Sequence, residues 1–214
     1  MDEPLSNLDA KLRNQMRAEI IKLRQKINTT FLYVTHDQTE AMTLGDRIVI
    51  MKDGWIQQIG TPQDVFDRPA NLFVAGFIGV PQMNFFDAEL VKNGDAYSVR
   101  VEDTEIALSA DKQANLAAKN VEGQKIVLGI RPNHIVLHQG SEGTIHGVID
   151  VYELMGSEVH LHVNVLGKDA IVIVPTVDIQ GDFKQVFATG TEVSFTFNAH
   201  SCHVFSADGK NLEW

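Results

Sequence analysis

Acidic side chains and one imidazole, at two places in the chain, could together carry out phosphoryl-transfer chemistry. Asp2 and Glu3 stand side by side, and His36 ends the apolar run of residues 30–35. One of two neighbouring carboxylates can hold Mg²⁺ through water while the other polarises the water that attacks a phosphoryl group. An imidazole at the tip of an adjacent parallel strand could reach the same phosphate, because ligands gather at the carboxyl ends of such strands. The alternative is that Asp2 and Glu3 form a solvated terminus.

The elements that must position these residues follow from local patterns. Apolar residues between 12 and 27 recur at steps of three and four, which predicts a helix that begins near Asp9. Residues 30–35 form a continuous β-branched and aromatic run, typical of a strand buried on both faces. Asp37 then offers an N-cap, with Glu40 three residues later, for a helix that ends at about Leu44.

The next segment predicts a hairpin and a further helix. Residues 47–51 and 55–59 are apolar runs on either side of Asp53-Gly54, a dipeptide typical of a tight hairpin turn. Thr61-Pro62 combines an N-cap residue with a proline suited to the first position of a helix. Up to this point the pattern is that of an α/β unit.

The composition changes near residues 68–71. Residues 1–69 carry 9 basic and 10 acidic side chains, whereas residues 70–214 carry 9 basic and 18 acidic ones. Seven of the eight histidines also lie in the second part. From about Phe85 the chain shows short apolar or alternating runs bounded by Gly, Asn and Asp, which predict a small antiparallel barrel or a pair of them.

Composition excludes several classes of protein. The 214 residues have a formal net charge of −10, which argues against a nucleic-acid binder, and the basic residues of segment 11–26 are those of a solvated helix face. The sequence has no apolar run near the ~18 residues that a membrane helix needs, and no signal peptide. With Cys202 as its only cysteine, the chain has no intrachain disulfide. We expect a soluble, unexported protein in a reducing compartment.

Three motifs, in this order, resemble those of ABC-transporter ATPases. Residues 1–4 are similar to the end of the Walker B strand, residues 6–9 to the D-loop, and residues 33–41 to the switch strand and H-loop. The resemblance assigns Asp2 to Mg²⁺ through water, Glu3 to the general base and His36 to γ-phosphate sensing. It implies that Ser6 and Asp9 contact the opposite subunit across the bound ATP.

Other motifs of that family are missing. The sequence contains no G-x-x-x-x-G-K-[ST] phosphate loop, no LSGGQ-type signature and no Q-loop. The resemblance therefore implies the C-terminal portion of a longer subunit. Such a portion should not hydrolyse ATP alone, because nothing in it cradles the triphosphate.

The resemblance extends into the second half and points to importers of the maltose and multiple-sugar type. The segments that carry it are residues 71–79, 83–85, 129–135, 153–160, 203–205 and 211–212. It implies an α/β fold, the end of an ATPase domain over residues 1–80, followed by an all-β OB-like (TOBE) regulatory barrel over residues 81–214. Expected partners are a second copy, integral membrane permease subunits and a cytoplasmic regulatory protein, at the cytoplasmic face of the membrane. No nucleic acid is expected.

Several alternatives stay open. The importer could instead serve polyamines, iron or an oxyanion, with Gly156-Ser157 as anion donors, although the acidic charge of residues 70–214 opposes an anion site. The chain could also be purely an interaction module. His160 and His162 would face one side of a strand, with three further candidate ligands between residues 200 and 203, but the spacings typical of dedicated zinc sites are lacking. Solvated or paired histidines are the preferred interpretation there.

Overall fold

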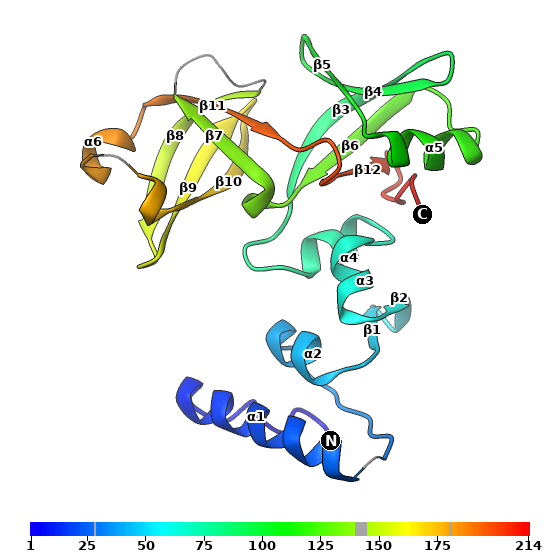
Figure 1. The fold of residues 1–214 in the computed structure, drawn as a ribbon, viewed down its shortest axis with the longest axis vertical. Coiled ribbons are helices and arrows are strands. Elements are labelled where there is room, and N and C mark those ends of the chain that lie inside the picture. Colours follow the sequence, from blue (N-terminus) through cyan, green and yellow to red (C-terminus); the bar gives the residue numbers. More distant parts are fainter. Residues whose placement is uncertain (28, 140–144, 180) are drawn as a thin grey trace. The chain divides into compact units, whose positions relative to one another are not determined.

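The computed structural model describes residues 1–27, 29–139, 145–179 and 181–214. The chain divides into two compact units, Met1–Ala70 and Asn71–Trp214. The boundary falls where the charge balance changes, while the proposed division of domains after residue 80 stays a prediction. Figure 1 traces both units along the chain.

The described residues of the first unit form three helices and one hairpin. They are α1 (Ala10–Ile27), α2 (Gln38–Leu44), β1 (Ile48–Lys52), β2 (Trp55–Gly60) and α3 (Pro62–Asp67). Asp37 and Thr61 cap α2 and α3 by accepting backbone N–H bonds, and Asp53 and Gly54 both have positive φ in the hairpin turn. These local predictions are confirmed, because a cap or a tight turn is decided by residues that are adjacent in sequence.

The prediction of a strand buried on both faces over residues 30–35 is wrong. Leu32 is 78% exposed and Val34 is 46% exposed. Among the described residues, this segment forms a single parallel bridge, between Val34 and Asp2. A continuous apolar run shows that a segment could be buried, but burial requires neighbouring strands. Of the residues that the structure describes, only the first three run alongside this segment.

In the second unit, the residues that the structure describes form two five-stranded antiparallel sheets. Their strand orders are β12-β6-β3-β4-β5 and β10-β9-β8-β11-β7. The strands are β3 (Asn84–Asn93), β4 (Ala96–Val101), β5 (Thr104–Ala107), β6 (Gln124–Ile130), β7 (Ile135–Gln139), β8 (Ile145–Leu154), β9 (Glu158–Val165), β10 (Lys168–Pro175), β11 (Glu192–Phe197) and β12 (Cys202–Ser206). The helices are α4 (Leu72–Phe77), α5 (Ala110–Ala118), α6 (Phe183–Val186) and the 3₁₀ turns η1 (Pro132–His134) and η2 (Thr176–Asp178).

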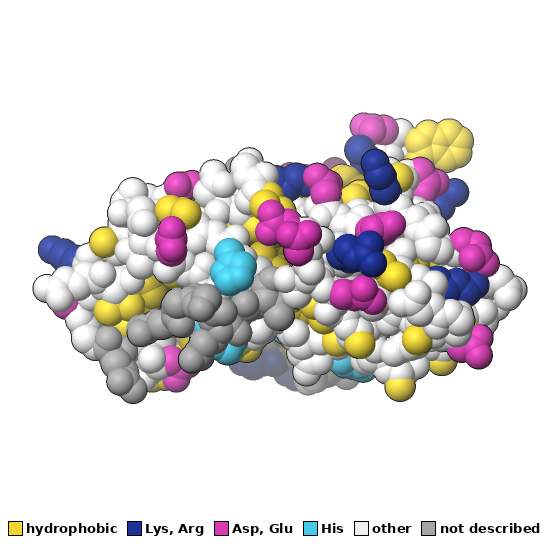
Figure 2. All heavy atoms as spheres, turned by 90° about the horizontal axis from the view of Figure 1, so that it is seen from above, with side chains coloured by type: hydrophobic (Ala, Val, Ile, Leu, Met, Phe, Trp, Pro, Cys, Tyr) yellow, Lys and Arg dark blue, Asp and Glu magenta, His cyan; other side chains and the backbone are white. Residues whose placement is uncertain are grey.

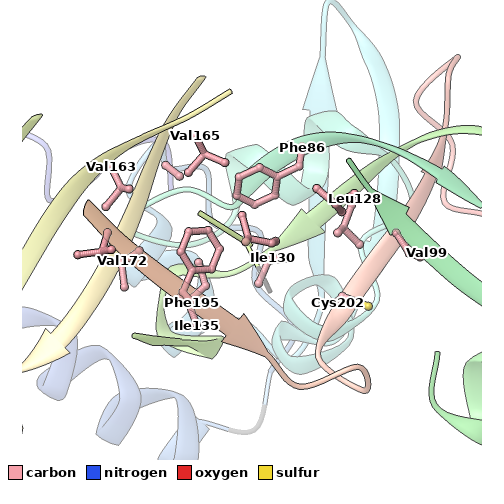
Figure 3. Packing of buried hydrophobic residues seen from close by; sticks show 14 of the residues in the cluster. Phe86, Val99, Leu128, Ile130, Ile135, Val163, Val165, Val172, Phe195 and Cys202 are labelled. Atoms are coloured by element: carbon pink, nitrogen blue, oxygen red, sulfur yellow. The ribbon is translucent and has the colours of Figure 1, made fainter. Parts of the chain in front are cut away.

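One hydrophobic core joins the two sheets. Phe86, from the first sheet, and Phe195, from the second, have ring centroids 6.2 Å apart. Figure 3 shows these rings with Ile130 and Val172 pointing into the same interior. On β9, Val159, Leu161, Val163 and Val165 are fully buried and alternate with polar residues, as expected for a strand with one face on a core. The prediction of small antiparallel β-structure is confirmed.

Candidate functional site

The first residues of the chain run parallel to the segment that carries His36. Val34 donates its N–H to the carbonyl of Met1 at 2.9 Å, and Glu3 donates its N–H to the carbonyl of Val34 at 2.9 Å. Asp2 and Val34 form the parallel bridge. Because the two stretches point the same way, Glu3 and His36 lie at the same end of this short ladder.

The structure brings the Glu3 carboxylate and the His36 imidazole into contact. His36 Nδ1 and Glu3 Oε1 are 3.1 Å apart, with side chains 71% and 45% exposed. The pKa of His36 is raised, first because its ring hydrogen-bonds to Glu3 and then because of the charge of that carboxylate. Glu3 has a φ of 40°, the left-handed region that only a few per cent of non-glycine residues adopt.

The other predicted site residues lie nearby, and two of them bond to local backbone. Asp2 is exposed. The Ser6 hydroxyl donates to the Glu3 carbonyl at 2.9 Å, and Asp9 Oδ1 accepts the N–H of Leu12 at 2.9 Å, so Asp9 caps α1. The structure therefore joins Glu3 to His36 and Ser6 to the backbone of Glu3, while Asp9 contacts the start of its own helix.

Sequence reasoning missed a buried carboxylate behind His36. Glu40 is 2% exposed, and its Oε2 accepts hydrogen bonds from the Tyr33 hydroxyl at 2.9 Å and the Thr35 hydroxyl at 2.8 Å. Arg13 Nε is 4.0 Å from Glu40 Oε1, and Arg13 also reaches Asp37 at 3.4 Å. The pattern had marked Glu40 only as a capping residue. The available signal was the pair of hydroxyl residues at alternate positions of the preceding run.

This cluster changes the acidity of its members. Burial raises the pKa of Tyr33, and the hydrogen bond to Glu40 raises it further. Burial also acts to raise the pKa of Asp37, but backbone N–H donors at Glu40 and Thr39 outweigh it, so that this pKa is lowered. Asp37 is thus held as a charged helix cap directly after His36.

Oxygen donors at this edge fit a magnesium ion held through water. Mg²⁺ keeps several of its waters and is bound through one or two carboxylates plus substrate phosphates, so that a cage of protein ligands is not required. The exposed Asp2 carboxylate can meet a hydrated ion in this way. Among the described residues, no group of three or more His, Cys, Asp or Glu side chains could hold a metal directly.

Three histidines of the second unit, His160, His162 and His200, lie beside carboxylates. His160 Nε2 is 2.7 Å from Glu158, and His162 Nδ1 is 3.1 Å from Asp169. His200 is exposed and contacts an aspartate at 3.2 Å, whereas Cys202 and His203 are buried. The candidate zinc ligands of residues 160–162 and 200–203 therefore do not converge on one point within the described chain.

One face of the molecule mixes side chains of both charges. On the face seen in Figure 2, Lys and Arg side chains are interspersed with Asp and Glu, and the described residues of that face form no basic track. No helix in the described ranges is both long and apolar enough to cross a membrane.

Comparison with known proteins gives two domain matches and several close relatives. Residues 79–135 match the MalK OB fold domain and residues 128–205 match the TOBE domain. An uncharacterised ABC transporter ATP-binding protein of Escherichia coli, YcjV, is 46% identical over 208 residues, which cover 97% of this chain and 55% of that protein.

Two further relatives carry import functions in their names. The oligosaccharides import ATP-binding protein MsmX of Bacillus subtilis is 44% identical, over 97% of this chain and 55% of MsmX. The maltose/maltodextrin import ATP-binding protein MalK of Vibrio parahaemolyticus is 38% identical, over 98% of this chain and 54% of that MalK. Among solved structures, the molybdate-binding protein ModG matches 56% of this chain and 94% of its own at a TM-score of 0.44 and 12% identity, a likeness too weak to carry an argument.

The chain spans about half the length of the curated relatives it matches. Its Walker B-like, D-loop-like and H-loop-like segments lie in the first unit, and both domain matches lie in the second. The chain belongs to the ABC transporter ATP-binding proteins and carries their MalK-type OB fold and TOBE domains.

Proposed function

We propose that this chain is the C-terminal portion of the ATP-hydrolysing subunit of an ABC importer for carbohydrates. The observation that carries the proposal is the 3.1 Å contact between Glu3 and His36. That contact places a carboxylate and an imidazole, 33 residues apart, at one end of a parallel ladder. The sugar class rests on relatives named for oligosaccharide and maltose import, and it is favoured over polyamine, iron or oxyanion import.

Each site residue has a distinct role in the proposal. Glu3 acts as the general base that takes a proton from the attacking water, and His36 senses the γ-phosphate beside it. Asp2 holds Mg²⁺ through water, and the ion, when bound, neutralises charge on the phosphates. Ser6 and Asp9 face the second subunit of a homodimer across ATP.

The contact of His36 with Glu3 suits this division of labour. A protonated imidazole can donate to a phosphate oxygen, and the neighbouring carboxylate raises the pKa of His36, so that it holds its proton more tightly. When Glu3 takes up a proton from water, its charge is lost and that effect disappears.

The assembly around the chain is also part of the proposal. The intact subunit is peripheral on the cytoplasmic face of the membrane and works with integral membrane permease subunits. Its OB-like second unit dimerises and receives a cytoplasmic regulatory protein. The first 80 residues belong to the ATPase domain and residues 81–214 to the regulatory barrel.

The experiment compares the chain with its longer form. The 214-residue chain should show no Mg²⁺-dependent ATPase activity, whereas the polypeptide encoded with its upstream phosphate loop should hydrolyse ATP. In that longer form, Glu3→Gln should lower turnover by about 10²–10⁴-fold, and Glu19→Gln, an exposed carboxylate on α1, should not. Full turnover in the Glu3→Gln variant would remove Glu3 from its role.

The interaction-module alternative has its own outcome. The second unit has a self-contained hydrophobic core and could associate without nucleotide. Sedimentation of the longer form with and without ATP separates the two interpretations. A longer form that dimerises fully without ATP and has no affinity for it would favour the module.

A further inference from the structure

His36 sits on a segment whose two faces are used differently. The side chains of Tyr33 and Thr35 point to one face and are half-buried, whereas Val34 and His36 on the other face are exposed. This alternation is the period of two expected for an extended chain. The exposed face places the imidazole beside Glu3. The opposite face carries the hydroxyls of Tyr33 and Thr35, whose hydrogen bonds can hold the segment in place.

The opposite face is anchored by the buried Glu40. Its carboxylate accepts both hydroxyls of that face, at 2.9 Å from Tyr33 and 2.8 Å from Thr35. The Thr35 oxygen in turn accepts the backbone N–H of Asp37 at 3.0 Å, and therefore fixes the turn on both sides of His36. Hydrogen bonds to a charged carboxylate are stronger than those between neutral groups.

Arg13 ties the same cluster to the loop that follows Glu3. Its guanidinium donates to the carbonyl of Leu8 at 3.1 Å and to the Asp37 carboxylate at 3.4 Å, and its Nε lies 4.0 Å from Glu40. A single cation thus bonds to the loop just before Asp9 and to Asp37, and it lies close to Glu40, the second carboxylate that follows His36.

We propose that Glu40, acting through the Thr35 hydroxyl, is a positioning residue that holds His36 beside Glu3. The catalytic meaning of this proposal rests on the proposed function. The hydrogen bonds that it describes, however, all lie within the 214-residue chain. Glu40 itself is 2% exposed and does not meet the substrate. Its effect reaches the imidazole through the hydroxyl and the Asp37 N–H.

The test uses two substitutions at Thr35 in the 214-residue chain. Thr35→Val keeps the shape and removes the hydroxyl, whereas Thr35→Ser keeps the hydroxyl and removes the methyl group. The readouts are the nuclear Overhauser contact between the His36 ring and the Glu3 side chain, and hydrogen exchange at the Glu3 amide, which donates to Val34. Thr43→Val is the matched control, because the Thr43 hydroxyl donates only within α2.

We expect Thr35→Val to abolish the ring contact and to speed exchange at the Glu3 amide by about tenfold or more. Thr35→Ser should restore both, and Thr43→Val should change neither. Tyr33→Phe, which removes the second hydroxyl, should weaken the contact in the same direction. Protected amides in α2 show that each variant has folded.

Two results would overturn the proposal. One is a His36–Glu3 contact that survives in Thr35→Val, and the other is a loss in Thr35→Ser as large as in Thr35→Val, which would mean that packing of the methyl group decides. Neither result involves ATP turnover. The proposed function fails instead if Glu3→Gln leaves hydrolysis in the longer form unchanged, so that the two failures are distinguishable.

Discussion

A buried ion pair in the second unit leads to the sharpest stability prediction. Lys112 Nζ, on α5, lies 2.7 Å from Glu213 Oε2 near the C-terminus, and their side chains are 3% and 0% exposed. Glu213 also accepts the N–H of Val204, so the pair fastens the last residues of the chain to β12 and α5. Lys112→Met removes the cation and keeps most of the aliphatic volume.

The expected cost follows from the burial of both groups. Removing one partner of a buried pair leaves an uncompensated charge and typically costs about 3–5 kcal/mol of unfolding free energy. For a unit of this size, 3 kcal/mol corresponds to a fall in Tm of roughly 10 °C. A second substitution, Glu213→Gln, removes the orphaned charge, so that the double variant should lose less than the sum of the two single losses.

The pH dependence of this loss has a definite sign. Burial raises the pKa of Glu213, and Lys112 acts against that rise. Without Lys112, the pKa of Glu213 in the folded state rises further above its value in the unfolded chain, about 4.3. The folded variant then holds the proton more tightly than the unfolded chain. Its loss of stability should therefore be smallest at low pH and grow as the pH rises through the folded-state pKa.

Thermal and urea unfolding at pH 5 and pH 8 measure these effects. Lys92→Met is the matched control, because Lys92 pairs with Glu122 at 2.9 Å on the surface, where removing a lysine should shift Tm little or not at all. If Lys112→Met is no more damaging than Lys92→Met, or if the two single losses simply add, the ion pair does not fasten the C-terminus as described.

Three further predictions concern other positions. Glu3→Gln should return the pKa of His36 towards its ordinary value, as followed by NMR titration, and an unchanged value would contradict the contact between them. Burial lowers the pKa of His203 to about 3, so the second unit should lose up to roughly 1.4 kcal/mol of stability per pH unit below pH 6.5, and His203→Phe should remove this acid sensitivity in unfolding curves. Gly147→Ala should destabilise the second unit by about 1–3 kcal/mol, measured by urea unfolding, because the new Cβ would meet a Val163 methyl at 2.5 Å.

Much of the first unit could be predicted from sequence because its elements are local. The helix after Asp9, the Asp37 cap and the Asp53-Gly54 turn depend on residues within four positions of one another, and the structure has all three. The short strands of the second unit were predictable for the same reason, since alternation along one strand reports a single buried face. Motif order also indicated which side chains to examine, among them Glu3 and His36.

Tertiary structure alone decided which side chains meet. Nothing along the sequence shows that Lys112 and Glu213, 101 residues apart, form an ion pair. Nor does it show that the Glu40 carboxylate accepts hydrogen bonds from two hydroxyls and does not act as the expected capping residue. The prediction that residues 30–35 form a strand buried on both faces is wrong. An apolar run indicates that a segment can be buried, but it does not indicate which strands lie beside that segment. The local order of residues sets the propensity of each segment for helix, strand or turn. Burial and charge pairing depend instead on segments that only the folded chain brings together.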